Sequence, residues 1–280
     1  MRVTIPNLLK KKKRGEKITM LTSYDSLFTR LIDKSEIDMI LVGDSLGMVV
    51  QGHNDTLSVT LDEMIYHTKI VVRNSNYPLI VADMPFMTYQ TNTYDAVVNA
   101  GRLIKESGAN AVKIEGGAEF SDTIKALVKA SIPVVGHIGL MPQSVNQIGG
   151  FKVQGKSKKR QEKMIEDAKK LEEAGAFAIV LEAIPYELAK EITQSVSIPT
   201  IGIGAGNATD GQVLVIYDLL GGDSSFNPKF LKKYLNLEEL VGNALNEYKK
   251  DVKKGNFPAI ENTFFKTKSK DEIITLYSKA

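Results

Sequence analysis

The chain has 280 residues, of which 43% are hydrophobic and 25% are charged, an ordinary composition for a globular protein. Its length is close to the roughly 250 residues of a typical α/β barrel. No apolar run approaches the roughly 20 residues that span a bilayer, so we do not expect this chain to be a membrane protein. The sequence has no cysteine, which excludes disulfides, thiolate nucleophiles and thiolate metal sites. The chemistry must come from oxygen and nitrogen groups.

The net charge of +3 does not indicate a nucleic-acid-binding protein. Lysines alternate with acidic residues in the segment 162–173, a pattern typical of a solvated helix face. The one compact basic run, residues 10–14, is interpreted as solvated too. It follows the short apolar start of the chain, whereas in a signal peptide the basic residues come first. We therefore expect a cytoplasmic protein that binds neither nucleic acid nor membranes.

Short apolar runs alternate with helical patterns along the chain. The expected strands cover residues 18–22, 39–42, 78–82, 111–114, 132–137, 176–181, 198–203 and 213–217. The expected helices cover residues 26–32, 61–72, 94–107, 121–130, 159–174 and 185–196, with one or two more over 228–254. Thr60 and Glu63 have the spacing of a capping box for the second of these helices. Residues 139–159, rich in Gly, Gln, Ser and Lys, are expected to form a long mobile lid.

Eight strands that alternate with helices favour a (β/α)8 TIM barrel. The alternative is a doubly wound open sheet, because the glycines of residues 202–206 resemble a dinucleotide-binding turn. That segment lacks the required spacing and comes late in the chain, which disfavours this alternative. We expect one barrel domain over residues 1–265 with N-terminal and C-terminal helical additions. Residues 266–280 are expected to be a tail with a short helix from Asp271.

Carboxylates end four of the expected strands, at Asp44, Asp83, Glu115 and Glu182. The C-terminal ends of the strands converge on one mouth of a parallel barrel, so these side chains should be neighbours. Taken singly, each could be a turn or helix-cap residue. Four together repel one another unless a cation neutralises some of them. Oxygen ligands favour Mg²⁺, Mn²⁺ or Ca²⁺ over Zn²⁺.

Two further polar residues belong to the expected strand ends. Lys113 lies inside an apolar strand, where a charge is costly unless it is paired, so we expect it to point toward the anionic site. His137 ends a strand and is interpreted as a site residue. His53 has no comparable placement, and His67 lies on a helix and is interpreted as structural.

Several segments resemble the ketopantoate hydroxymethyltransferase family, and the match runs collinearly from about residue 2 to 265. A single motif of this kind would be weak, but a collinear set is specific. The matching segments are Val42-Gly-Asp-Ser-Leu-Gly-Met-Val49, Asp62-Glu-Met-Ile-Tyr-His-Thr68, Val81-Ala-Asp-Met-Pro-Phe86, Val112-Lys-Ile-Glu-Gly-Gly117, Gly136-His-Ile-Gly-Leu140, Gly149-Gly-Phe-Lys-Val-Gln-Gly155, Phe177-Ala-Ile-Val-Leu-Glu182 and Ile201-Gly-Ile-Gly-Ala-Gly206.

The resemblance implies a barrel of the phosphoenolpyruvate/pyruvate-type superfamily that starts pantothenate synthesis. It implies transfer of a hydroxymethyl group from 5,10-methylenetetrahydrofolate to the 2-oxo acid 3-methyl-2-oxobutanoate, through a Mg²⁺-stabilised enolate, giving 2-dehydropantoate and tetrahydrofolate. It also implies a homo-oligomer, a decamer. By motif, the metal residues are Asp44, Asp83 and Glu115, the last directly or through water; the substrate-binding residues are Asp44, Ser45, Asp83, Lys113 and His137; and the catalytic base is Glu182.

Two departures from the family pattern bear on the shape of the pocket and leave the charged positions intact. Met87-Thr88 stands where a Gly-Ser pair is common, and Ala183 stands where a Cys is frequent. The alternative function is another Mg²⁺-dependent 2-oxo-acid lyase or mutase of the same superfamily. Lyases of that kind rely on a loop Cys that this chain lacks. A non-catalytic anion-binding or metal-binding protein, which would need no base at Glu182, is the remaining alternative.

Overall fold

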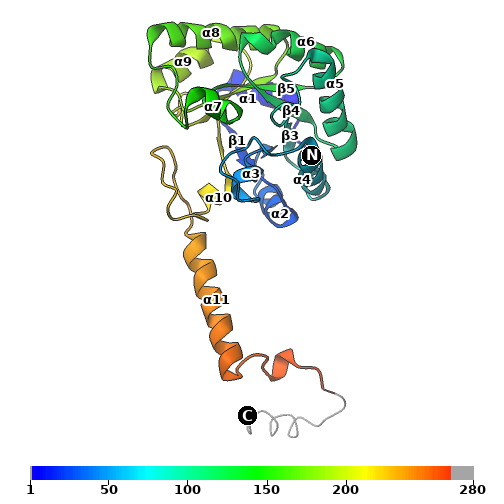
Figure 1. Cartoon of the computed structure of the whole chain (residues 1–280), viewed down its shortest axis with the longest axis vertical. Helices are drawn as coiled ribbons and strands as arrows, with labels where there is room; N and C mark the ends of the chain where they lie inside the picture. The colour runs from blue at the N-terminus through cyan, green and yellow to red at the C-terminus, as the bar shows by residue number, and fades with distance from the viewer. Residues whose placement is uncertain (1, 266–280) are drawn as a thin grey trace. The chain divides into compact units, whose positions relative to one another are not determined.

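The computed structural model describes residues 2–265 and contains a closed barrel of parallel strands (Figure 1). The strands follow one another around the barrel in chain order, and β1 pairs with β8 to close it. They are β1 (Ile18–Thr22), β2 (Met39–Val42), β3 (Leu79–Asp83), β4 (Ala111–Glu115), β5 (Val134–Gly139), β6 (Ala178–Glu182), β7 (Thr200–Ile203) and β8 (Gly211–Leu214). The prediction of a (β/α)8 barrel is confirmed, and the open-sheet alternative is excluded.

Helices follow most strands and cover the outside of the barrel (Figure 1). The α-helices are α1 (Ile5–Arg14), α2 (Ser26–Lys34), α3 (Leu46–Val49), α4 (Leu61–Arg73), α5 (Thr93–Arg102), α6 (Ser121–Lys129), α7 (Val145–Ile148), α8 (Lys158–Glu173), α9 (Tyr186–Ser195), α10 (Ile216–Leu219) and α11 (Leu237–Lys254). The expected capping box of Thr60 and Glu63 is present at the start of α4.

Among residues 2–265, no helix has the length and apolar character needed to cross a bilayer.

Helix α1 packs against the N-terminal end of the barrel. Leu8 is fully buried in the same apolar cluster as the first residues of several strands. Lys11 Nζ lies 2.5 Å from Asp38 Oδ1, and Lys12 Nζ lies 2.8 Å from Asp210 Oδ2. The interpretation of the basic run as solvated is therefore wrong for these two lysines. They join α1 to the residues that precede β2 and β8.

Inward-facing side chains change from apolar to polar along the strands. Successive strand residues point to opposite faces, so the residue two positions after an inward-facing core residue faces inward as well. Four strands carry such pairs, with the first member in the apolar core and the second at the mouth: Val81 and Asp83, Ala111 and Lys113, Val135 and His137, Val180 and Glu182. This alternation places charged groups on top of a packed apolar core.

Two expected elements end earlier in the structure than the pattern indicated. Strand β8 ends at Leu214 because the chain turns there, and the N–H of Ile216 donates to Thr22 Oγ1 at 3.0 Å. The helix expected over 94–107 is α-helical only to Arg102 and continues as a π-turn over Leu103–Ser107. The expected lid contains a 3-10 turn at Pro142–Ser144 and the short helix α7.

The chain divides into two compact units. The first comprises residues 1–216 and 228–231 and contains the whole barrel. Among the described residues, the second comprises 217–227 and 232–265; its longest element is α11, none of whose residues is buried. The expectation of a single domain over 1–265 stays a prediction. The expected tail at 266–280, with its helix from Asp271, lies outside the described residues.

Candidate active site

Five charged side chains from four neighbouring strands meet at the barrel mouth, and the strand register explains their contacts. Asp83 is the pairing partner of Lys113, and Glu115 is the partner of His137. Lys113 Nζ lies 2.9 Å from Asp83 Oδ1 and 3.8 Å from Glu115 Oε1. His137 bridges two carboxylates, with Nδ1 at 3.4 Å from Glu115 Oε1 and Nε2 at 3.3 Å from Glu182 Oε2. We call these five residues together with Asp44 the mouth cluster.

Asp44 joins the cluster from the turn after β2. Its backbone N–H donates to Asp83 Oδ2 at 3.1 Å, so two carboxylates share one small space. The residue before it is Gly43, where a Cβ atom would lie 2.7 Å from Ser45 Oγ and 3.4 Å from Asp83 Oδ2. A side chain at this position would therefore displace the Ser45 hydroxyl, whereas its contact with Asp83 would be an ordinary one.

Ser45 lies beside Asp44 at the mouth and is held by Tyr24, whose hydroxyl is 2.8 Å from Ser45 Oγ. The carbonyl of Tyr24 is in turn 2.7 Å from His67 Nδ1. His67 thus contacts the backbone that supports the site, in line with its interpretation as a structural residue.

Gln143 is a site residue that the sequence analysis missed. It is buried, and its Nε2 donates to Asp44 Oδ2 at 2.8 Å and to the carbonyl of Met84 at 2.9 Å. Its backbone N–H donates to Glu115 Oε2 at 3.0 Å. The Tyr89 hydroxyl donates to Gln143 Oε1 at 2.8 Å and fixes the amide orientation. Gln143 lies inside the segment expected to be a lid, where no periodic pattern marked it.

The electrostatics of the mouth cluster show a shortage of positive charge. Burial first, and then repulsion by Asp83 and Glu115, hold the pKa of Asp44 well above its usual value. Burial also raises the pKa of Asp83, even though Lys113 opposes the change. For Lys113, burial would lower the pKa, but attraction to the carboxylates outweighs burial and raises it. The cluster therefore holds its ammonium group firmly charged while two of its carboxylates are destabilised as anions.

Glu115 and His137 stabilise each other in their charged forms. Burial would raise the pKa of Glu115, but contacts with His137 and Lys113 lower it. Burial and the nearby Lys113 would lower the pKa of His137, but Glu115 and Glu182 raise it to about 9. His137 is thus an imidazolium at neutral pH. With every group ionised, four carboxylates face two cations, and two negative charges are left over.

Two buried atoms of the cluster lack hydrogen-bond partners among residues 2–265. Asp83 Oδ1 and His137 Nε2 have charged neighbours at ion-pair distance, but the angles are not those of hydrogen bonds. Unpaired buried polar atoms are costly, and they are found where a ligand is bound. Glu182 is the accessible carboxylate, with 21% of its side chain exposed against 3% for Glu115. A small molecule at the mouth would therefore meet Glu182 first.

The donor set suits a hard divalent cation. Asp44 and Asp83 lie next to each other, Asp83 Oδ1 has no hydrogen bond within residues 2–265, and the mouth cluster has two uncompensated negative charges, which matches what Mg²⁺ neutralises. Across residues 2–265, no three Asp, Glu or His side chains converge as a ready-made metal cage. Mg²⁺ does not need one, since it is usually held by one or two carboxylates and keeps waters or substrate oxygens as its other ligands.

Comparison with known proteins decides between the chemistries open to such a site. The sequence model described as ketopantoate hydroxymethyltransferase matches residues 2–260. The chain belongs to the ketopantoate hydroxymethyltransferase family. A 3-methyl-2-oxobutanoate hydroxymethyltransferase of Clostridium botulinum (strain 657 / Type Ba4) is 58% identical over 98% of this chain and 98% of its own length. The Enterococcus faecalis enzyme of that name is 57% identical, over 94% and 96%.

Solved structures agree on the fold. A phosphonopyruvate hydrolase superimposes with a TM-score of 0.62 at 13% identity, over 99% of this chain and 95% of its own. A 2,3-dimethylmalate lyase, described as a member of the PEP mutase/isocitrate lyase superfamily, gives a TM-score of 0.58 at 16% identity over the same shares. The chain therefore shares its barrel fold with these proteins, and the superfamily implied by the resemblance stays a prediction.

Membership of the ketopantoate hydroxymethyltransferase family confirms the predicted function and the enzyme class. The protein is a hydroxymethyltransferase that acts on 3-methyl-2-oxobutanoate, the first step of pantothenate biosynthesis. Every site residue predicted from the sequence lies at the barrel mouth. The lyase and mutase alternative and the non-catalytic alternative are not supported.

Proposed function

We propose that the mouth cluster catalyses this transfer with Mg²⁺ as cofactor and 5,10-methylenetetrahydrofolate as one-carbon donor. The observation that carries the proposal is the arrangement of one accessible carboxylate, Glu182, above a buried set of charges with one negative charge in excess. Such a set suits binding of a cation together with a chelating 2-oxo acid. The accessible carboxylate is then free to act as a base.

Asp44 and Asp83 are the metal residues in this proposal. They are adjacent, buried and destabilised as anions, and Asp83 Oδ1 lacks a hydrogen bond. Glu115 is engaged on both oxygens, by His137 and by the Gln143 N–H, and would hold the metal directly or through water. Mg²⁺ supplies Lewis acidity toward the keto and carboxylate oxygens of the substrate.

The remaining residues of the cluster bind the keto acid and move its proton. Ser45 and the imidazolium of His137 bind the substrate, and His137 offers its unpaired Nε2. Glu182 removes the proton from C3 and becomes a carboxylic acid, leaving the electron pair on the substrate as an enolate. Lys113 is the buried positive charge that lowers the free energy of this negative species.

Carbon–carbon bond formation completes the reaction. One carbon–nitrogen bond of the donor breaks as a proton moves to that nitrogen, water adds to the resulting iminium carbon, and the second carbon–nitrogen bond breaks to leave tetrahydrofolate and formaldehyde. The enolate carbon C3 then attacks the formaldehyde carbon, and the new alkoxide takes the proton from Glu182, which gives the hydroxymethyl group. The residues of this chain contribute position and charge, and the donor contributes the electrophilic carbon.

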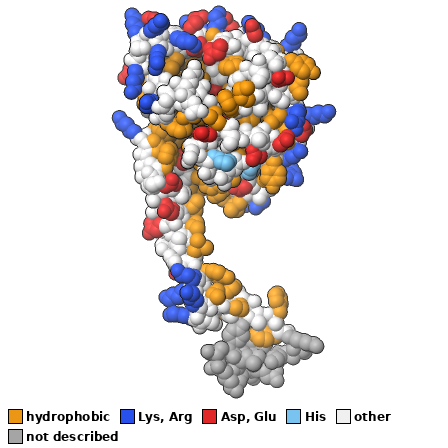
Figure 2. Space-filling model, in the orientation of Figure 1, with side chains coloured by type: hydrophobic (Ala, Val, Ile, Leu, Met, Phe, Trp, Pro, Cys, Tyr) orange, Lys and Arg blue, Asp and Glu red, His pale blue; other side chains and the backbone are white. Residues whose placement is uncertain are grey.

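We also infer that the protein is a homo-oligomer, and the decamer implied by the resemblance stays a prediction. Helix α11 supports the inference, because Figure 2 shows hydrophobic side chains along it. The exposed apolar residues recur at helical spacing, at Leu240, Val241, Leu245, Tyr248 and Val252. Such a stripe is stable in water only when another surface covers it.

Product formation under defined conditions tests the proposal. Purified protein stripped of metal should form 2-dehydropantoate only when Mg²⁺, the keto acid and 5,10-methylenetetrahydrofolate are all supplied, with tetrahydrofolate released in equal amount. Full activity in the presence of a chelator would overturn the metal assignment. Activity with free formaldehyde but none with the folate would overturn the donor assignment.

A further inference from the structure

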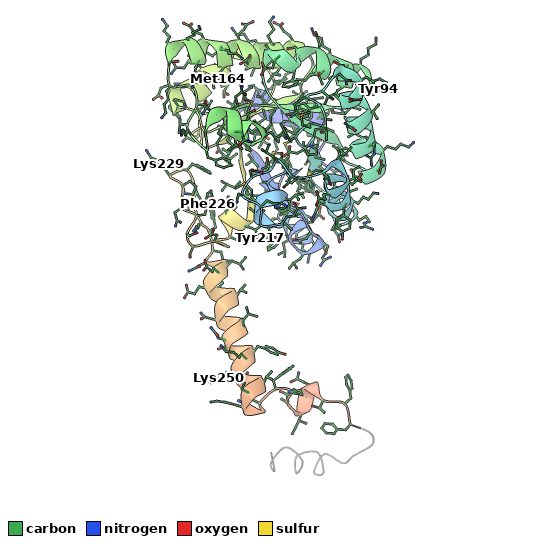
Figure 3. All side chains as sticks on the ribbon, viewed as in Figure 1. Tyr94, Met164, Tyr217, Phe226, Lys229 and Lys250 are labelled. Carbon is green, nitrogen blue, oxygen red and sulfur yellow. The ribbon has the colours of Figure 1, made fainter. Side chains whose placement is uncertain are left out.

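Asp167 is a buried carboxylate that takes no part in the chemistry described above. It lies on α8, three residues after Met164, which Figure 3 marks on that helix. Only 8% of its side chain is exposed. Within residues 2–265, its hydrogen bonds and ion pair go to Lys163 and Ala118, and none goes to the mouth cluster. Burying a carboxylate is costly unless it is paired, so these two contacts account for its place in the fold.

The Asp167 carboxylate holds the turn that leaves β4. Its Oδ1 accepts the backbone N–H of Ala118 at 3.0 Å. Its Oδ2 lies 2.7 Å from Lys163 Nζ, one helical turn earlier on α8. Ala118 begins the 3-10 turn at Ala118–Phe120 and lies three residues after Glu115, the last residue of β4. Asp167 therefore ties the outer helix α8 to the turn that follows a residue of the mouth cluster.

The two glycines that follow Glu115 lie closely against this turn's neighbours. A Cβ atom on Gly117 would lie 2.3 Å from Cγ of Asp167 and 2.5 Å from its Oδ1. A Cβ atom on Gly116, whose φ is +127°, would lie 2.3 Å from the Phe120 ring. Cβ atoms do not come this close to other atoms, so a side chain at either glycine would displace the carboxylate or the ring. The glycine pair is thus explained by packing on Asp167 and Phe120.

Contacts on both sides of the turn carry its position to Glu115. The N–H of Gly116 donates to the carbonyl of His137 at 2.9 Å. The Phe120 ring packs edge-on against Tyr89, with the ring centroids 5.2 Å apart. The Tyr89 hydroxyl in turn accepts the N–H of Glu115 at 3.0 Å. A shift of the turn would therefore move the backbone that carries the Glu115 carboxylate.

We propose that Asp167 is a positioning residue for Glu115, which the proposed function places at the metal directly or through water. Its carboxylate fixes the turn after β4, and the turn fixes where the Glu115 carboxylate lies relative to Asp44 and Asp83. The inference rests on the proposed Mg²⁺ site and adds that a contact made by the outer helix α8 sets the affinity of that site. Groups that orient metal-binding side chains change the affinity for the metal without touching it.

Calorimetric titration of metal-free protein with Mg²⁺, in the presence of 3-methyl-2-oxobutanoate, tests this inference without relying on turnover. Asp167→Ala removes the acceptor for the Ala118 N–H and should raise the Kd of Mg²⁺ about ten-fold, the lower end of the effect of such partners. Asp167→Asn keeps an acceptor oxygen in the same place, and the exposed Lys163 can turn away from the new amide. The Kd of Asp167→Asn should therefore equal that of wild type.

Glu172→Ala is the matched control, because Glu172 is another carboxylate of α8 that holds a turn. Its Oε1 accepts the backbone N–H of Ser197 at 2.8 Å. Ser197 precedes β7 and so lies at the opposite end of the barrel from the mouth. Glu172→Ala should lower the free energy of unfolding and leave the Kd of Mg²⁺ unchanged. A purely structural role would give the same result for Asp167→Ala.

Gly117→Ala tests the same contact from the other side, and it carries the test if Asp167→Ala does not fold. Its methyl group would displace the Asp167 carboxylate and should also raise the Kd of Mg²⁺. The double variant Gly117→Ala, Asp167→Ala has room for the methyl group, so its Kd should be no higher than that of Asp167→Ala alone. Additive changes in binding free energy would show that the two residues act independently.

The failure of this inference can be told from the failure of the proposed function. Wild-type Kd values in both Asp167→Ala and Gly117→Ala would overturn the positioning role and leave the metal assignment intact. An equal rise of the Kd in Glu172→Ala, or a Kd in Asp167→Asn as high as in Asp167→Ala, would also overturn it. If wild type bound no Mg²⁺ with the keto acid present, the metal assignment would be wrong, and the positioning role with it.

Discussion

The side-chain amide of Gln143 donates a hydrogen bond of 2.8 Å to Asp44, although the two residues are 99 positions apart in the chain. The same glutamine accepts from Tyr89 and donates its backbone N–H to Glu115. It therefore orients one proposed metal ligand and the carboxylate next to the metal at once. Residues that hydrogen-bond to metal ligands influence the affinity for the metal.

Replacing Gln143 by Ala should lower the apparent affinity for Mg²⁺ and kcat/KM by about 10- to 100-fold, the usual effect of losing such a partner. Activity should be measured as a function of Mg²⁺ concentration. Gln90→Ala is the control. The Gln90 side chain donates to the side-chain amide oxygen of Gln143 at 2.9 Å and accepts from the Tyr89 N–H, and within residues 2–265 it makes no hydrogen bond to Asp44 or Glu115. If Gln143→Ala binds Mg²⁺ as wild type does, Asp44 needs no such support.

The mouth cluster was predictable from the sequence because its positions follow from local rules. Asp83, Glu115 and Glu182 end short apolar strands, and Lys113 and His137 lie two residues before a strand end. Parallel strands in a barrel bring their ends together whatever the loop lengths are. Strand alternation then points these side chains inward. None of this requires knowledge of a distant contact.

Gln143 and the lysines of α1 were not predictable in the same way. Gln143 lies in a segment without periodicity, and its partners come from three other parts of the chain. Lys12 contacts Asp210, 198 positions away, and a run of basic residues looks identical whether it is solvated or paired. Contacts of this kind are set by packing of the whole fold, which local patterns do not encode.

The pKa of His137 predicts how stability depends on pH. Its pKa is about 9 in the folded protein against an ordinary value of 6.5, so the folded state binds the proton more tightly. The resulting stabilisation is complete below about pH 6.5 and is lost as the pH rises through about 9. The free energy of unfolding relative to His137→Gln, measured in EDTA, should fall by roughly 3 kcal/mol between pH 6 and pH 10. A constant difference would show that the imidazole is neutral in the folded state.

Two glycines in the same backbone conformation allow a matched test of packing at the mouth. Gly139 and Gly150 both have φ of +105°. A Cβ atom on Gly139 would lie 2.2 Å from the carbonyl oxygen of Glu182, whereas one on Gly150 would meet nothing within 4 Å.

Gly150→Ala should lower the free energy of unfolding only by the backbone strain, about 1–2 kcal/mol. Gly139→Ala should lower the free energy of unfolding, measured with urea, by more than this. It should also lower kcat, because the clash displaces the backbone of Glu182. Equal losses of stability with full activity in both variants would mean that the β5–β6 contact does not position Glu182.

Proton exchange at C3 of the keto acid tests the central claim most directly, because it isolates the step assigned to Glu182. Wild-type protein with Mg²⁺ and 3-methyl-2-oxobutanoate in D₂O, without folate, should lose the C3 proton signal in the NMR spectrum. Glu182→Gln should retain binding of Mg²⁺ and the keto acid, because Asp44 and Asp83 are intact, yet exchange at least about 100-fold more slowly. Undiminished exchange in Glu182→Gln would contradict the account.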